Sequence, residues 1–211
     1  MSSEALRRGQ LFVVAAPSGA GKTSLVHALV ASDPRLVISV SYTTRPPRPG
    51  ETDGQHYHFT TPARFAAMQA AGEFLEHAQV FGHAYGTHAR TTRDLLQGGQ
   101  DVILEIDWQG ARQVRESSPS CHSIFILPPS LEALRQRLGA RAQDSAEVIA
   151  GRMDKARAEI SHCHEFEFVV VNAVFAEALA QLSGIVSACR DNREIHSDRH
   201  EELLEELLRS S

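Results

Sequence analysis

A glycine-rich loop that ends in a lysine is the clearest chemical signal in the sequence. Residues 16–23 read Ala-Pro-Ser-Gly-Ala-Gly-Lys-Thr, between the apolar run 11–15 and a segment with a helical pattern. Backbone N–H groups at the start of such a helix are unpaired, and they can hold a polyphosphate. Gly19 and Gly21 allow backbone conformations closed to other residues and leave no Cβ in the way. The order of strand, loop and helix therefore predicts a phosphate-binding loop.

Different residues of this loop are expected to contact the phosphates and the metal ion. Lys22 is expected to reach the β- and γ-phosphates of a nucleoside triphosphate, and the Thr23 hydroxyl to ligate Mg²⁺. The general pattern has a glycine where this chain has Ala16, so we expect ordinary backbone geometry there. The alternative is a glycine-rich turn that binds nothing, and the Gly-Lys-Thr ending favours the phosphate site. The residues expected to contact the triphosphate are Ala16, Pro17, Ser18, Gly19, Ala20, Gly21, Lys22 and Thr23.

A second group of basic residues lies in a proline-rich stretch at 43–50, which reads Thr-Thr-Arg-Pro-Pro-Arg-Pro-Gly. Prolines favour extended, polyproline-like backbone with about three residues per turn. Arg45 and Arg48 are three apart, so their guanidinium groups should project to one side. Two such groups suit a phosphate dianion, to which Tyr57 could add a hydroxyl. The alternative is a solvated loop, but a phosphate donor site upstream requires an acceptor, which favours the clamp.

The elements that would position these residues follow an alternating order. Five short apolar runs predict buried strands at 11–15, 36–40, 102–106, 123–127 and 168–171. Most are continuous rather than alternating, as in a parallel sheet covered on both faces. Helical patterns at 22–31, 131–138 and 146–160 separate several of them. We therefore predict an α/β fold, a doubly wound parallel five-stranded sheet of the P-loop NTPase type. Its ligands should bind at the carboxyl ends of the strands.

The span between residues 40 and 102 breaks that order. It contains strand-like pieces at 56–60 and 74–81 and helical pieces at 63–71 and 90–96, the last ended by two glycines. This composition predicts a small mixed lobe inserted into the sheet. At the other end of the chain, leucine pairs at helical spacing predict an amphipathic helix at 197–208, for which a partner-binding role is the less favoured alternative.

Composition limits the classes of function. The chain has 211 residues, a net charge of −5 and three cysteines. There is no overall basic field to attract nucleic acid, so we expect no nucleic-acid partner. The odd number of widely spaced cysteines is typical of reduced thiols in a cytoplasmic protein. With no targeting segment apparent, and no apolar run near the roughly 20 residues that span a bilayer, we expect a cytoplasmic protein without a membrane partner.

Several strings, in this order, resemble the guanylate kinase family. They are the loop at 16–23, Ser-Tyr-Thr-Thr-Arg-Pro-Pro-Arg-Pro-Gly-Glu at 41–51, Phe-Leu-Glu-His-Ala at 74–78, Tyr-Gly-Thr at 85–87, Glu-Ile-Asp-Trp-Gln-Gly at 105–110, Ile-Phe-Ile-Leu-Pro-Pro-Ser at 124–130 and Val-Val-Val-Asn at 169–172. Each string alone is weak, but their joint occurrence is specific. The resemblance covers residues 10–189. A small residue is usual in this family in place of the first loop glycine.

The resemblance implies phosphorylation of GMP, and of dGMP, by Mg-ATP. By position, Ser41, Glu76, Thr87 and Asp107 would surround guanine, while Arg45, Arg48, Tyr57 and Tyr85 would hold the GMP phosphate, with Gly86 allowing close approach. Asn172 would belong to the ATP side. A carboxylate such as Glu76 offers two acceptors to the two donors of guanine, N1–H and the 2-amino group. Asp107 could instead hold Mg²⁺ through water; we favour the guanine side.

The transfer step should depend on positioning and charge. A phosphate acceptor is largely ionised near neutral pH, since its second pKa is about 6, so no general base is required. The resemblance places Arg137, Arg141 and Arg152 in a mobile lid over the triphosphate, and Gly139 is a plausible hinge. These arginines, with Lys22 and Arg45, are the expected catalytic residues. The alternative is that the lid arginines only keep a helix solvated.

The resemblance also divides the chain. We expect a core of residues 1–40, 102–138 and 157–211, a GMP-binding lobe of 41–101 and a lid of 139–156. Rival interpretations are a non-catalytic interaction module of the same fold and a related sugar-bisphosphate kinase. Such modules tend to lose the loop lysine or the lid arginines, and both are present here. His162-Cys163-His164 and the pair His196 and His200 are better explained as structural or surface residues than as metal ligands.

Overall fold

A computed structural model of the chain describes residues 8–80, 82–139, 146–195 and 197–209. The predictions made for Arg141 and His196 fall outside these residues. The chain forms two compact units: Met1–Val13 with Pro34–Cys121, and Val14–Asp33 with His122–Ser211. We call them the first and the second unit and describe each by itself.

A five-stranded sheet carries the strands expected from the apolar runs. Its order is β2-β7-β1-β8-β9, and the pairs β2–β7 and β8–β9 are parallel. The strands are β1 (Leu11–Ala15), β2 (Leu36–Ile38), β7 (Asp101–Glu105), β8 (His122–Leu127) and β9 (Phe168–Val171). All of β1 is buried, as its unbroken run of apolar residues predicts. The predicted α/β fold with a parallel five-stranded sheet is confirmed.

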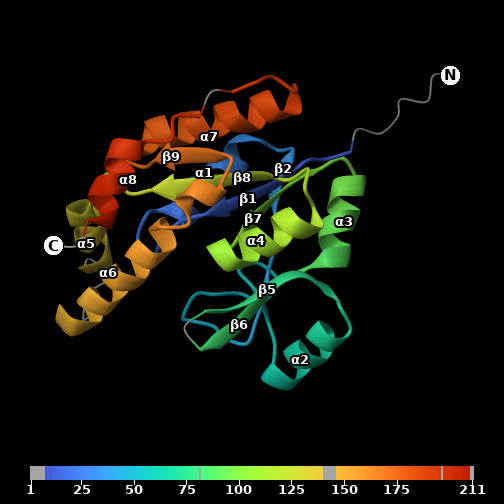
Figure 1. Ribbon diagram of the computed structural model, residues 1–211. Helices are drawn as coiled ribbons and strands as arrows, with labels where there is room; N and C mark the ends of the chain where they lie inside the picture. The colour runs from blue at the N-terminus through green and yellow to red at the C-terminus, as the bar shows by residue number, and fades with distance from the viewer. Residues whose placement is uncertain (1–7, 81, 140–145, 196, 210–211) are drawn as a thin grey trace. The chain divides into compact units, whose positions relative to one another are not determined.

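The first unit also contains a second, four-stranded sheet of order β4-β3-β6-β5 (Figure 1). These strands are β3 (Tyr42–Thr43), β4 (His58–Phe59), β5 (Phe74–Val80) and β6 (His83–His88). Its helices are α2 (Pro62–Ala70), α3 (Ala89–Gln97) and α4 (Trp108–Ser117). The Thr61 hydroxyl accepts a hydrogen bond from the Arg64 N–H, and proline opens α2, which together fix where the helix begins.

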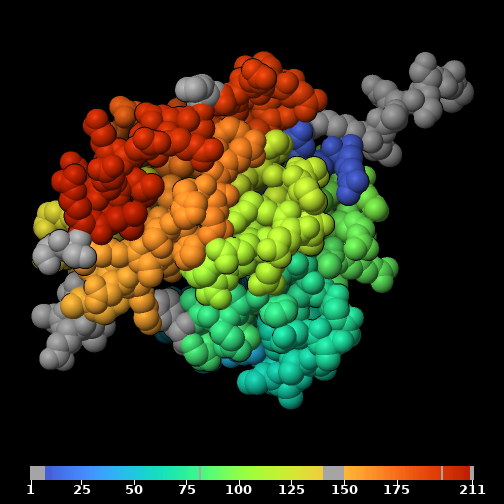
Figure 2. All heavy atoms as spheres, in the orientation of Figure 1, coloured from blue at the N-terminus to red at the C-terminus, as the bar shows by residue number. Residues whose placement is uncertain are grey.

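The second unit surrounds β8 and β9 with helices. They are α1 (Lys22–Ser32), α5 (Leu131–Gly139), α6 (Ala146–Ile160), the 3₁₀ turn η1 (Cys163–Glu165), α7 (Phe175–Arg190) and α8 (Glu201–Leu208). Helix α1 packs against α7 and α5 against α6. Helix α8 lies against α6 (Figures 1 and 2). Leu207 of α8 is buried, so its apolar face is a packing face.

Some expectations need correction. The tail helix begins at Glu201 rather than at 197, because His200 adopts a left-handed backbone conformation with φ 51° that cannot continue into a helix. The strand expected at 36–40 ends at Ile38. Helices α4 and α7 and strands β3 and β6 were not assigned from the sequence. The three cysteines are free thiols, as expected. Among the described residues, no helix is long and apolar enough to cross a membrane.

Candidate active site

The phosphate loop takes the backbone path that its glycines allow. Gly19 and Gly21 have φ of 90° and 91°, and Ala16 is not among the residues with positive φ. A Cβ added to Gly21 would lie 2.4 Å from the Asn172 side-chain nitrogen, so both the backbone and the packing require glycine there. Helix α1 starts at Lys22, which places Lys22 and Thr23 in its first turn. This is the strand, loop and helix arrangement that the sequence predicts.

Two side chains hold the outer side of the loop through one carbonyl. Asn172 follows β9, and its Nδ2 donates to the Ala20 carbonyl at 2.8 Å. The Arg137 Nη1 atom lies 3.4 Å from the same oxygen, and its Nη2 donates to the Asn172 carbonyl at 3.0 Å. Asn172 contacts the loop backbone, and Arg137 contacts both the loop backbone and the Asn172 carbonyl. The structure therefore gives both residues a role in fixing the loop.

The carboxylate of Glu159 on α6 meets the loop at another point. It accepts a hydrogen bond from the Ser18 N–H at 2.9 Å. Arg152, on the same helix, has its Nη1 3.5 Å from the Leu138 carbonyl at the end of α5. The helix that carries a predicted lid arginine is thus tied both to the loop and to α5.

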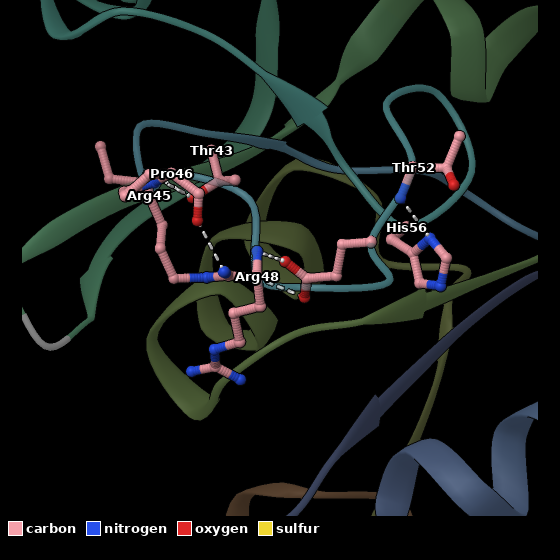
Figure 3. Close-up of polar contacts among 8 residues, drawn as sticks. Thr43, Arg45, Pro46, Arg48, Thr52 and His56 are labelled. Carbon is pink, nitrogen blue, oxygen red and sulfur yellow. Dashed lines mark hydrogen bonds and ion pairs between the residues drawn. The ribbon is translucent and has the colours of Figure 1, made fainter.

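In the first unit, Glu51 forms a salt bridge with Arg45, one of the two arginines of the predicted phosphate clamp. Arg45 donates from Nη2 to Glu51 Oε1 at 2.7 Å and from Nη1 to the Pro46 carbonyl at 2.8 Å (Figure 3). The second Glu51 oxygen accepts from the Arg48 N–H at 2.7 Å. These contacts, that of Arg45 first, hold the pKa of Glu51 at about 2 and raise the pKa of Arg45.

Aromatic rings from two strands complete the surroundings of Arg45. Its guanidinium lies 5.4 Å from the centre of the Tyr57 ring and 5.8 Å from that of Phe59, and Tyr85 is among the groups that raise its pKa. The Tyr57 and Tyr85 rings are 5.8 Å apart. Burial, and then the charge of Glu105, raises the pKa of Tyr57, so its hydroxyl stays protonated and can donate. The structure therefore brings Arg45, Tyr57 and Tyr85 together.

The other two residues of the predicted clamp differ in their surroundings. Arg48 is exposed, and its side chain points away from its own backbone N–H, which is bonded to Glu51 (Figure 3). Gly86 is buried, and an added Cβ would lie 2.9 Å from the Phe74 ring. Its lack of a side chain is thus explained by packing against Phe74.

A buried carboxylate forms the centre of the predicted base site. Glu76 on β5 is 3% exposed and pairs in register with Thr87 on β6, whose hydroxyl donates to Glu76 Oε1 at 2.6 Å. A Cβ added to Gly110 on α4 would lie 2.4 Å from Glu76 Oε2 and 3.4 Å from Asp107 Oδ1. Gly110 therefore lies beside both carboxylates and leaves room for them.

The remaining residues of the base site lie at element ends. Asp107 is the N-cap of α4, and its Oδ1 accepts from the Gly110 N–H at 2.8 Å. Ser41 directly precedes β3, and its carbonyl accepts from the His58 N–H. Among the residues that the structure describes, no group of three or more histidine, cysteine, aspartate or glutamate side chains is arranged to hold a metal ion.

Sequence reasoning missed three residues of these sites. Glu51 closes the string that contains Arg45 and Arg48. An acid so close to two arginines was the available signal that it could pair with one of them. Gly110 lies in the string at 105–110, but only the packing against Glu76 explains it. Glu159 gave no local signal, because it meets Ser18 from 141 residues away along the chain.

A parallel sheet with a glycine loop between β1 and α1 defines a nucleotide-binding protein of the P-loop class. The family model of guanylate kinase matches residues 8–189. The guanylate kinase of Alkalilimnicola ehrlichii is 58% identical over 201 residues, covering 95% of this chain and 97% of the relative. That of Nitrosococcus oceani is 58% identical over 200 residues, covering 95% and 98%.

Solved structures agree. The crystal structure of guanylate kinase from Anaplasma phagocytophilum is 34% identical and has a TM-score of 0.73, covering 87% of this chain and 90% of that one. The chain belongs to the guanylate kinase family. Its enzyme class is ATP:GMP phosphotransferase, and its substrates are small nucleotides.

Proposed function

We propose that the enzyme transfers the γ-phosphoryl group of Mg-ATP to GMP and also to dGMP, and that the two sites described above carry the two nucleotides. The buried Glu76 carboxylate, held by Thr87, is the observation that carries the proposal. Guanine presents two donors to such a carboxylate, whereas adenine presents an acceptor at N1. A site built on hydrogen bonds can reject such an analogue by about 10⁴–10⁵-fold.

The GMP phosphate would bind to the arginine and tyrosine group of the first unit. Arg45 donates two of its five N–H groups to Glu51 and Pro46, which leaves donors for a phosphate. Arg48 would add a second guanidinium from the exposed side of the loop. These contacts involve base and phosphate rather than the ribose 2′-hydroxyl, which is why dGMP should also be a substrate.

On the donor side, the loop amides and Lys22 would bind the triphosphate. A hydroxyl is a hard oxygen ligand that suits Mg²⁺, and Thr23 stands in the first turn of α1 where such a ligand is needed. The metal would neutralise charge on the phosphates. Ser41 and Asp107 would complete the guanine site. Arg137, Arg141 and Arg152 would close over the triphosphate, for which Arg137 would have to leave the Ala20 and Asn172 carbonyls that it contacts in this structure. This assignment implies a core, a GMP lobe of 41–101 and a lid of 139–156.

The substrate assignment is tested by measuring ADP release with GMP, dGMP, AMP or no acceptor. We expect turnover with GMP and dGMP, and background rates with AMP and without acceptor. Equal turnover of AMP and GMP would contradict the guanine site. Turnover that persists after the divalent metal is chelated would contradict the role of Mg²⁺.

Lys22→Ala tests the donor assignment. Loss of the one ammonium expected at the β- and γ-phosphates should lower kcat at least about 100-fold with the thermal unfolding midpoint unchanged. Lys155→Ala removes the chain's other lysine, near the end of the proposed lid, and should lower kcat far less than Lys22→Ala. Near-normal turnover of Lys22→Ala would remove the loop from the mechanism.

A further inference from the structure

A second cluster of reactive side chains lies at the opposite end of β9 from the phosphate loop. Asn172, which contacts the loop, follows the last residue of β9, whereas Glu167 precedes the first. Glu167 and Asn172 are five residue steps apart along an extended strand, which is about 16 Å. Strand β8 runs parallel to β9 and begins at His122, so His122 and Glu167 lie at the same, amino-terminal edge of the two strands. The kinase mechanism uses neither residue.

The cluster joins a thiol, an imidazole and a carboxylate. His122 Nδ1 lies 3.1 Å from Glu167 Oε2, and the imidazole also hydrogen bonds to Cys189 of α7. The Cys189 contact first, and then that of Glu167, raises the pKa of His122 to about 10. A nucleophile bonded to a base that a third group orients is the arrangement that activates cysteines in proteins.

Cys189 borders a hollow in the protein. A cavity of about 1510 Å³ is bordered by all three residues of the cluster and by the segment that follows α7. The charged or titratable groups that face it besides the cluster are Arg193, Glu194, Asp198, Arg199, His200, Glu201 and Glu202. A small reagent that enters this cavity meets the cysteine, although its surface is only 5% exposed.

The position of Cys189 in its helix disfavours a thiolate, so activation of this thiol depends on His122. Cys189 lies in the last turn of α7 (Phe175–Arg190), where the negative end of the helix dipole opposes an anion. A thiolate there needs a neighbouring cation, and an imidazolium of His122 held by Glu167 would supply one. The chain contains a contrasting thiol: Cys163 is 1% exposed, and burial raises its pKa to about 12.

We propose that Cys189 is a reactive thiol, activated by His122 and oriented through Glu167, that is modified by hydroperoxides. The thiolate sulfur attacks the hydroperoxide oxygen, the S–O bond forms and the O–O bond breaks. The leaving hydroxide or alkoxide takes the proton of the His122 imidazolium. Sulfur is oxidised by two electrons to a sulfenic acid and the peroxide is reduced to water or an alcohol, so the step balances without another reactant.

The test measures the alkylation rate of each cysteine with iodoacetamide by peptide mapping of the full-length protein at pH 7. Cys189 should react at least about tenfold faster than Cys163 and Cys121, and the three rates should converge in urea. His122→Gln should slow Cys189 by about tenfold, and Glu167→Gln should slow it less. Both variants should retain GMP-dependent ADP release, which shows that they are folded.

Treatment with hydrogen peroxide tests the oxidation step itself. Hydrogen peroxide should produce a dimedone-reactive sulfenic acid on Cys189 and none in Cys189→Ser. A Cys189 rate no higher than that of Cys163, a rate unaffected by His122→Gln, or rapid alkylation without sulfenic acid would each overturn the proposal.

Discussion

The two candidate nucleotide sites bind anions and bases by different means. In the second unit, the phosphate loop would bind with backbone N–H groups, and side chains such as Asn172 and Arg137 hold the loop from outside. In the first unit, binding would fall to side chains, which are already paired with one another: Arg45 with Glu51 and Glu76 with Thr87. A backbone site should fail when its chain path changes, whereas a side-chain site should fail when a charge or a hydrogen-bond partner changes.

The largest expected effect comes from the backbone site. Gly21→Ala puts a Cβ 2.4 Å from the Asn172 side chain at a φ of 91°, so the loop must shift. We expect kcat/KM for ATP to fall at least about 100-fold, with the KM for GMP nearly unchanged. Gly184→Ala, in α7 with nothing near the added Cβ, is the matched control and should leave activity intact.

Glu76→Gln should have a comparable effect on the other substrate. The amide replaces one acceptor by a donor that faces a donor of guanine, so hydrogen bonds to a charged group are lost. We expect the KM for GMP to rise by about 100-fold and the preference over AMP to shrink, while the KM for ATP stays the same. Unchanged discrimination between GMP and AMP would place guanine recognition elsewhere.

Gly110→Ala tests the packing that positions the same carboxylate. The added Cβ would lie 2.4 Å from Glu76 Oε2, which forces the acid or α4 to move. We expect the KM for GMP to rise by about tenfold, because the hydrogen-bond geometry is disturbed rather than removed. If Gly110→Ala binds GMP normally, as Gly184→Ala should, the carboxylate is not fixed by this contact.

The smallest expected effect concerns Glu51. Its pKa in the folded protein is lowered to about 2 from 4.5, so its contribution to stability is present above pH 4.5 and is lost as the pH falls towards 2. Glu51→Gln removes this contribution, and its thermal midpoint should approach that of the wild type as the pH falls through this range. The KM for GMP should rise several-fold, since Arg45 loses a partner.

The same difference between the sites explains what the sequence could predict. The phosphate loop is one contiguous string whose chemistry follows from backbone geometry, so its position, its positive φ angles and the strand and helix beside it were predicted. The five buried strands were equally readable, because continuous apolar runs indicate a covered parallel sheet. Helix α7 was not assigned, although it forms 16 residues of packed structure.

The side-chain sites depend on register and on long-range contacts. That Glu76 meets Thr87 follows from the pairing of β5 with β6, and strand β6, with its central glycine and histidines, gave no strand pattern. The salt bridge between Glu51 and Arg45 depends on how the proline-rich loop turns back. The resemblance named candidate site residues, and the structure shows which of them contact one another.

Titration calorimetry of the wild type, Gly21→Ala and Glu76→Gln with GMP and with a non-hydrolysable ATP analogue tests the division of work most directly. The account predicts a crossed result: Gly21→Ala loses affinity for the ATP analogue and keeps that for GMP, and Glu76→Gln does the reverse. Equal loss of both ligands in either variant, while it remains folded, would contradict the assignment of one nucleotide to each site.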